Sequence, residues 1–194
     1  MRACTPESLP VTALLPPAPI TARTTSTTAR TTSAAALAAA LLAVSDAWLP
    51  RVQFREGSRW TGLLPSDEAA DLIDPSLADD LAGAQVWLLT WLPGQGTTLH
   101  DHGGSAGAFA VVGGILTEDV VGGRPGAARE AATELWAGRV RPFGPHHVHR
   151  VTNRGTLPAV SVHAYTPRLS LMNRYRLEAG TLLRTGTEKA GVDW

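Results

Sequence analysis

The chain has 194 residues, 44% of them hydrophobic and 18% charged, which is the size and composition of one globular domain. Its 17 basic and 17 acidic residues cancel, so a protein that binds nucleic acid by neutralising phosphates is not indicated. The single cysteine, Cys4, excludes an internal disulfide framework and a cysteine-rich metal site. The longest apolar run, between Ala34 and Val44, is too short to span a bilayer.

The first 32 residues are rich in Pro, Thr, Ala and Arg and have no apolar period. We therefore expect a disordered tail over residues 1–32 and a single domain over residues 33–194. So long a segment before the apolar stretch does not fit a secretory signal, and we expect a cytoplasmic protein.

The sequence becomes rich in Ala and Leu over residues 33–49. This pattern predicts one helix that ends before Pro50. The residues that can share its apolar face are Leu37, Leu41, Leu42 and Trp48.

Short β-branched or aromatic runs fill the chain from residue 51 onward, for example QVWLLTWL and PAVSVHAY, and Gly, Pro or Asn separates nearly all of them. Many short strands with closely spaced turns predict an all-β sandwich or closed barrel. There is no Gly-rich loop followed by a helix, so a nucleotide-binding fold is not supported.

All six histidines lie within 64 residues of one another in this β region: His100, His102, His146, His147, His149 and His163. His100 and His102 are two residues apart, so on a strand both point to one face. Imidazole is the commonest protein ligand for metals, and a third histidine from a neighbouring strand would complete a facial set. An ordinary pair of core or surface histidines is the alternative interpretation of this motif.

The spacing around these histidines resembles the two motifs of the cupin superfamily. The positions that fit are Gly94, His100, His102 and Gly114 in the first motif, and His149 and Asn153 in the second. The Glu position of the first motif is Gly107, and the Pro and Gly positions of the second are Gly144 and His146. The resemblance implies a cupin (double-stranded β-helix or jelly-roll) barrel after a short N-terminal helix. It also implies a three-histidine metal site, His100, His102 and His149, open to an anionic, chelating substrate.

Three segments sharpen the resemblance to the thiol dioxygenases, the cysteine dioxygenase family: HDHGGSAGAF, HVHRVTN and PAVSVHAYTP. The resemblance covers about residues 51–175. It implies a mononuclear Fe(II) enzyme that oxidises L-cysteine with O2 to cysteine sulfinate. Ser161, His163 and Tyr165 alternate along one strand and therefore share a face. The resemblance makes them a hydrogen-bonded relay that holds the tyrosine hydroxyl over the iron. A half-polar strand with a satisfied core histidine is the alternative.

The chain departs from the family at two positions that bear on the substrate. Gly107 replaces the cysteine that is crosslinked to the tyrosine in animal members, so no crosslink forms here, as in bacterial members. The family's carboxylate-binding arginine aligns with Thr61 or Gly62. Arg59, two residues earlier on the same strand face, is one candidate replacement, although it is equally interpreted as an exposed strand arginine. Arg168 is another, because arginine offers a bidentate fork to a carboxylate.

The expected partners are a small thiol and O2, with no nucleic acid and no membrane, and we expect a monomer. Three alternatives remain open: a dioxygenase for 3-mercaptopropionate or another small thiol, a zinc or nickel cupin of different chemistry, and a non-catalytic ligand sensor. His147 shares a strand face with His149 and is an alternative third ligand, but the motif spacing favours His149. We interpret His146 and His147 as supporting or exposed residues, and the six tryptophans as packing residues.

Overall fold

The computed structural model describes residues 26–190 of the chain. Its helical elements are α1 (Thr27–Ala43), α2 (Ser45–Trp48), η1 (Leu49–Arg51, 3-10), α3 (Ser66–Ala70), η2 (Pro75–Leu77, 3-10) and α4 (Ala78–Ala82). Its strands are β1 (Thr61–Leu64), β2 (Gln85–Trp91), β3 (Leu99–Asp101), β4 (Ala106–Gly113), β5 (Ile115–Gly122), β6 (Arg129–Trp136), β7 (Val140–Phe143), β8 (His149–Thr152), β9 (Ala159–Thr166), β10 (Leu171–Glu178) and β11 (Thr181–Lys189).

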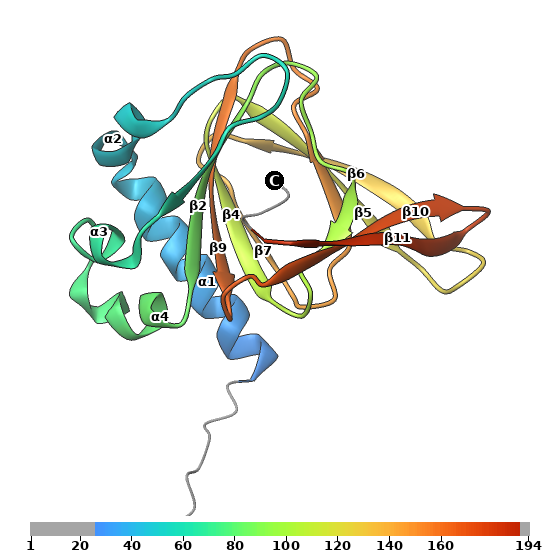
Figure 1. Cartoon of the computed structure of the whole chain (residues 1–194), viewed down its shortest axis with the longest axis horizontal. Coiled ribbons are helices and arrows are strands. Elements are labelled where there is room, and N and C mark those ends of the chain that lie inside the picture. The colour runs from blue at the N-terminus through green and yellow to red at the C-terminus, as the bar shows by residue number, and fades with distance from the viewer. Residues whose placement is uncertain (1–25, 191–194) are drawn as a thin grey trace, which may run out of the picture.

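The strands form two antiparallel sheets that face each other around an open-ended barrel (Figure 1). The five-stranded sheet has the order β1-β2-β9-β4-β7, and the six-stranded sheet has the order β11-β10-β3-β8-β5-β6. The strand order crosses over between the sheets repeatedly, as in a double-stranded β-helix. The prediction of an all-β jelly-roll barrel preceded by a short helical segment is confirmed.

Strand β9, in the middle of the five-stranded sheet, is buried on both of its faces. Val160, Val162 and Ala164 pack with α1, which lies across the outer face of this sheet (Figure 1). The alternate residues point inward, where Tyr165 joins the second apolar cluster between the sheets. All eight residues of β9 are buried, because strand side chains alternate between two faces that are both covered.

The N-terminal helix begins earlier and ends earlier than the sequence predicts. Residues 27–32, expected in the tail, are helical because the Ser26 hydroxyl caps the helix by accepting from the Ala29 amide at 3.2 Å. The predicted single helix is broken at Val44, and α2 follows, with the Trp48 indole donating to the Leu41 carbonyl at 2.8 Å. Residues 1–25 lie outside the described residues, so the rest of the tail stays a prediction.

Over residues 26–190, no single helix has the length and apolar character needed to cross a membrane. Only α1 taken together with the segment Ser45–Arg51, bent by 76° relative to it, meets that test, and only by length and composition.

Candidate metal centre

Three histidines converge between the sheets. His100 lies on β3, His102 follows that strand directly, and His149 begins β8. The antiparallel pairing of β3 with β8 places His100 opposite His149. The ring centroids lie 4.8–5.1 Å apart, and each residue offers one nitrogen within 4.8 Å of the other two. All three residues are buried, so the sequence-predicted set forms one compact cluster.

The Asp of the H-D-H motif fixes the turn that presents His102. Asp101 accepts a hydrogen bond from the Gly103 amide at 2.8 Å, and Gly103 has the left-handed φ of +58° that favours glycine. The Asp101 carboxylate also accepts from the Asn173 amide at 2.9 Å and from the Tyr175 hydroxyl at 2.7 Å. Strand β10 is therefore tied to the turn between the two histidines.

Hydrogen bonds fix the tautomer of two of the three rings. His100 Nδ1 is 2.8 Å from the Thr98 carbonyl, and His149 Nδ1 is 2.7 Å from Glu118 Oε1. A carbonyl and a carboxylate only accept, so in both neutral rings Nδ1 carries the proton. Nε2 is then the unprotonated nitrogen in both His100 and His149. These two rings are prepared to offer a lone pair before any metal is bound.

His102 gives the clearest sign that the cluster fits a metal. Both of its ring nitrogens are buried and have no hydrogen-bond partner within the described part of the chain, an arrangement that is costly in a folded protein. Burial, and then the neighbouring imidazoles, lower the pKa of all three histidines, so the rings are neutral. Neutral imidazoles are the form that binds divalent cations, and a metal would satisfy His102. The residues present therefore fit a mononuclear three-histidine centre.

A phenyl ring occupies the place where a fourth, carboxylate ligand would project. Gly107 on β4 pairs with Phe143 on one side and with Tyr165 on the other. A Cβ at Gly107 would lie only 2.5 Å from the Phe143 ring, which stacks on His102 at 4.6 Å between centroids. The absence of a side chain at Gly107 thus lets Phe143 pack against the His102 ring.

The inward face of β9 carries a chain of hydrogen bonds beside this cluster. Ser161 Oγ is 2.9 Å from His163 Nε2, and the Tyr165 hydroxyl is 3.3 Å from His163 Nδ1. The Tyr165 ring lies 5.1 Å from the His102 ring. Burial lowers the pKa of His163 to about 3 and raises the pKa of the Tyr165 phenol. Both groups are consequently neutral, so the phenol keeps a proton to donate.

Trp91 extends this chain by one residue that sequence reasoning had assigned to packing. Its indole Nε1 donates to Ser161 Oγ at 2.9 Å across the β2–β9 pair. An indole N–H can only donate, so Ser161 must accept from it. A buried indole N–H needs an acceptor, so the sequence indicates that Trp91 has one. It does not indicate which residue, because Ser161 lies 70 residues away.

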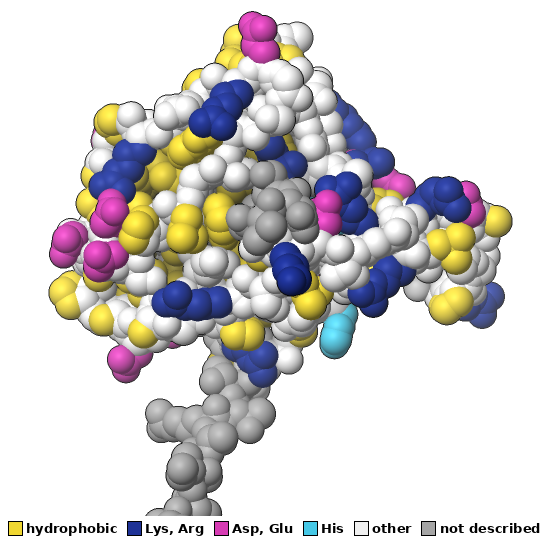
Figure 2. All heavy atoms as spheres, viewed as in Figure 1, with side chains coloured by type: hydrophobic (Ala, Val, Ile, Leu, Met, Phe, Trp, Pro, Cys, Tyr) yellow, Lys and Arg dark blue, Asp and Glu magenta, His cyan; other side chains and the backbone are white. Residues whose placement is uncertain are grey.

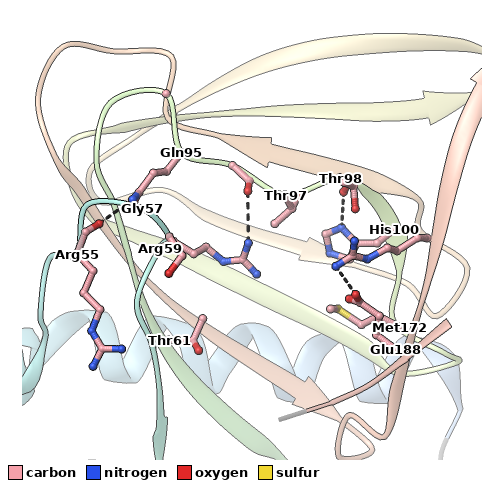
Figure 3. Close-up of a pocket in the computed structure, with 14 residues that line it drawn as sticks. Arg55, Gly57, Arg59, Thr61, Gln95, Thr97, Thr98, His100, Met172 and Glu188 are labelled. Atoms are coloured by element: carbon pink, nitrogen blue, oxygen red, sulfur yellow. Dashed lines mark hydrogen bonds and ion pairs between the residues drawn. The ribbon is translucent and has the colours of Figure 1, made fainter. Parts of the chain in front are cut away.

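A cavity of about 610 Å³ opens beside the cluster and reaches it through His100 (Figure 3). The charged residues that line it are Arg55, Arg59, Arg174 and Glu188. Glu188 is ion-paired with Arg174, which lies opposite His100 on β10. Figure 2 shows Lys and Arg side chains on several parts of this face of the molecule, and in the cavity lining three arginines outnumber the one carboxylate. The cavity therefore suits an anionic ligand.

The two arginine candidates differ in position. Arg59 points into the cavity over the Trp91 ring, 5.4 Å from its centroid, and donates to the Gly96 carbonyl at 3.4 Å (Figure 3). Its Nε is buried and has no partner among the residues that the structure describes, and burial lowers the pKa of the guanidinium. Arg168 is exposed and does not line the cavity; its guanidinium contacts the Ser66 hydroxyl and the Ala82 carbonyl. Arg168 thus lies outside the barrel against the short helices after β1, and its part in substrate binding stays a prediction.

Glu118 on β5 was missed by the sequence reasoning. It has no exposed surface, and its Oε1 accepts from His149 Nδ1 at 2.7 Å and from His147 Nε2 at 2.9 Å. Burial raises the pKa of the carboxyl, but these hydrogen bonds and Arg141 outweigh burial and hold the pKa well below its usual range. His147 therefore lies behind His149, while His146 is exposed.

The family model for cysteine dioxygenase type I matches residues 76–178, just over half of the chain. This range contains the histidine cluster and the β9 relay, whereas Arg59 precedes it. No curated protein matches the chain significantly in sequence.

Three solved structures resemble the fold. An uncharacterised double-stranded β-helix protein of Klebsiella pneumoniae has 20% identity and a TM-score of 0.45, with 60% of this chain and 83% of that chain covered. TT1209 of Thermus thermophilus has 20% identity and a TM-score of 0.43, with 62% and 94% covered. Oxalate decarboxylase of Bacillus subtilis has 19% identity and a TM-score of 0.46, with 62% of this chain and 29% of that chain covered.

Proposed function

This chain belongs to the cysteine dioxygenase type I family, and we propose on that premise that it oxidises a small thiol carboxylate to its sulfinate with O2. The observation that carries the proposal is the buried cluster of His100, His102 and His149, which lies beside the Tyr165 ring and opens to a cavity with basic side chains. L-Cysteine is the first substrate to test, and cysteine sulfinate is the expected product.

We assign Fe(II) to the three histidines because the family implies it, since imidazole ligands alone suit several metals. When bound, ferrous iron supplies the redox chemistry that transfers both atoms of O2 to the sulfur. The protein contributes three neutral ligands, which leave the full charge of the cation to favour a thiolate over a thiol. Phe143 keeps the position beside His102 apolar instead of providing a carboxylate.

Arg59 is the proposed partner of the substrate carboxylate. Its guanidinium is partly buried; among residues 26–190 its Nε has no acceptor, and its hydrogen bond to the Gly96 carbonyl is long. A buried cation without a carboxylate partner is costly, and an anionic ligand would satisfy it. Arg174, by contrast, is already paired with Glu188. Arg59 therefore replaces the family arginine expected at Thr61 or Gly62.

The relay of Ser161 and His163 has the proposed task of aiming the Tyr165 proton. If Ser161 accepts from Trp91 and donates to His163 Nε2, then His163 Nδ1 carries a proton and donates to the phenol oxygen. The phenol proton is then directed to a ligand in the site. A donor held in advance where negative charge develops lowers the barrier of the reaction.

A specific observation favours 3-mercaptopropionate or another small thiol as an alternative substrate. The position of the family's carboxylate-binding arginine, Thr61 or Gly62, is not an arginine here. Arg59 lies two or three residues before that position in the sequence. A displaced carboxylate would change which chain length between sulfur and carboxylate fits best. The same cluster and the same relay would serve either substrate.

Oxygen-electrode assays of the iron-loaded protein test the proposal with L-cysteine, 3-mercaptopropionate and cysteamine, which lacks the carboxylate. We expect O2 uptake with one of the two carboxylates, little with cysteamine, and two labelled oxygens in the sulfinate formed under labelled O2. Stoichiometric zinc or nickel in the purified protein, with no O2 uptake for any thiol after iron loading, would refute it. The monomeric state and the cytoplasmic location stay predictions, and light scattering tests the first.

A further inference from the structure

The three histidines differ in the group that fixes each ring. His100 donates to a neutral backbone carbonyl. His102 is held by ring contacts with Phe143 and Tyr165. His149 meets a carboxylate, that of Glu118. A hydrogen bond to an ionised acceptor is about twice as strong as one between neutral groups, so His149 has the most strongly oriented ring of the three.

The surroundings of Glu118 hold its carboxylate in one position. Strand β5 pairs with β8, with Val120 opposite His149, so Glu118 lies two residues along from that pair. Oε1 accepts from both His147 and His149, and Oε2 accepts from Arg141 Nε. A fully buried carboxylate is stable only with such donors. The same three contacts leave it little freedom to rotate.

We propose that Glu118 is a positioning residue for the metal centre, which orients His149 so that its Nε2 faces His100 and His102 and which makes His149 the strongest of the three donors. This role rests on the proposed function, because it takes the three histidines as metal ligands. Carboxylates that accept from the second nitrogen of a ligating histidine fix the tautomer and raise the basicity of the ligand. His147 and Arg141 act one step further out, by holding Glu118.

An alternative interpretation of Glu118, His147 and His149 is that they form a second metal site. Glu118, His147 and His149 each offer one atom within 4.8 Å of the other two. Two features of the described residues disfavour it. The nitrogens of both histidines already lie at hydrogen-bond distance from the same oxygen. The Arg141 guanidinium also contacts Glu118 directly, and a positive charge there opposes a second cation.

Metal affinity separates positioning from a structural role. Co²⁺ is titrated into metal-free wild type and Glu118→Gln in competition with a coloured chelator, and thermal melting is recorded for each. Asp119→Asn is the matched control, because Asp119 is the next residue on β5, is also buried, and is paired with Arg150 and Arg154 instead of an imidazole.

We expect Glu118→Gln to bind Co²⁺ about 10- to 100-fold more weakly than wild type, with an altered visible spectrum. Asp119→Asn should lower the melting temperature and keep the wild-type affinity and spectrum. Equal Co²⁺ affinity in the Glu118→Gln and Asp119→Asn variants would overturn the proposal. So would a second equivalent of Co²⁺ in wild type that Glu118→Gln and His147→Ala each abolish, because Glu118 would then be a ligand.

A measurement on wild type covers the case in which Glu118→Gln does not fold. Long-range ¹H–¹⁵N spectra of the zinc-loaded protein should show His149 protonated at Nδ1, with that proton strongly deshielded. Zinc on Nδ1 of His149 would contradict the proposal. These readouts are independent of turnover: wild type that binds metal as expected but oxidises no thiol would refute the proposed function and leave the role of Glu118 intact.

Discussion

The two sheets of the barrel contribute different chemistry to the site. The six-stranded sheet carries His100 and His149, together with Glu118 behind them. The five-stranded sheet carries the relay that ends at Tyr165, and α1 covers its outer face (Figure 1). The proposed ligands thus come from the six-stranded side of the barrel and the proposed proton donor from the five-stranded sheet. The difference implies that changes in the five-stranded sheet can lower turnover while metal stays bound, whereas changes to the histidines on the six-stranded side should remove both.

The largest expected effect follows from removing a ligand on the six-stranded side. Changing His100, His102 or His149 to Ala should abolish both bound iron and activity, because two remaining imidazoles do not make a stable site. Metal analysis of the purified variants, alongside O2 uptake, checks this. His147→Ala is the comparison, since His147 lies behind His149 and should keep bound iron. Iron retained in His149→Ala and lost in His147→Ala would mean that the third ligand is His147.

Tyr165→Phe tests the contribution of the five-stranded sheet. The change keeps the ring that lies against His102 and deletes only the hydroxyl. Turnover should fall by about 10-fold or more, and iron content should equal that of wild type, because removal of one aligned donor costs up to about 2.7–4 kcal/mol in such sites. Kinetics at saturating thiol, with metal analysis, measures both quantities. Unchanged turnover at equal iron content would reduce Tyr165 to a packing residue.

A pair of arginine variants tests which arginine binds the substrate carboxylate. Arg59→Gln should lower kcat/KM for the carboxylate thiol by about 10- to 100-fold, since a hydrogen bond to a charged group is worth about 1.5–3 kcal/mol. Arg168→Gln should leave kcat/KM close to wild type, because Arg168 contacts Ser66 and Ala82 outside the cavity. Steady-state assays of both variants decide the matter. The assignment fails if Arg168→Gln has the larger effect.

The smallest expected effect is on the pH dependence of stability. Burial lowers the pKa of His102 and lowers that of His163 to about 3, so both stay neutral in the folded protein while the unfolded chain binds protons below about 6.5. The unfolding free energy of metal-free protein is therefore highest above that pH, where neither state binds these protons, and it falls as the pH drops from 6.5 to 5. Each such histidine contributes a slope of about 1.4 kcal/mol per pH unit.

Denaturant titrations of metal-free wild type at pH 7.5, 6.0 and 5.0 measure that slope. Two variants, His102→Phe on the six-stranded side and His163→Phe on the five-stranded side, should each reduce the slope by about the contribution of one proton. A wild-type slope near zero between pH 6.5 and 5 would contradict the neutral, buried state of these rings.

Local spacing placed several of the candidate site residues on common strand faces, and the family resemblance joined them into one candidate site. The interval of two residues between His100 and His102, and the alternation of Ser161, His163 and Tyr165, placed side chains on common faces before any fold was known. The boundaries of the N-terminal helix were harder to predict, because the Ser26 cap extends α1 into threonine-rich sequence that has no apolar period.

The residues that sequence reasoning missed or misplaced share one property: their partners lie far away in the chain. Glu118 reaches His149 across 31 residues, and Trp91 reaches Ser161 across 70. Arg59 and Arg168 are equally plausible in sequence, and only the course of the chain after β1 separates them.

The sequence by itself predicted the all-β fold, the shared face of His100 and His102 and the strand face that carries the tyrosine, because these depend on periodicity within single segments. The resemblance to the cupin motifs added the barrel type and His149 as the third histidine. The tertiary structure alone decided which carboxylate supports His149, which indole ends the relay and which arginine enters the cavity. Those contacts depend on the register of antiparallel pairs such as β5 with β8 and β2 with β9, which is set by packing of the whole barrel and not by any local pattern.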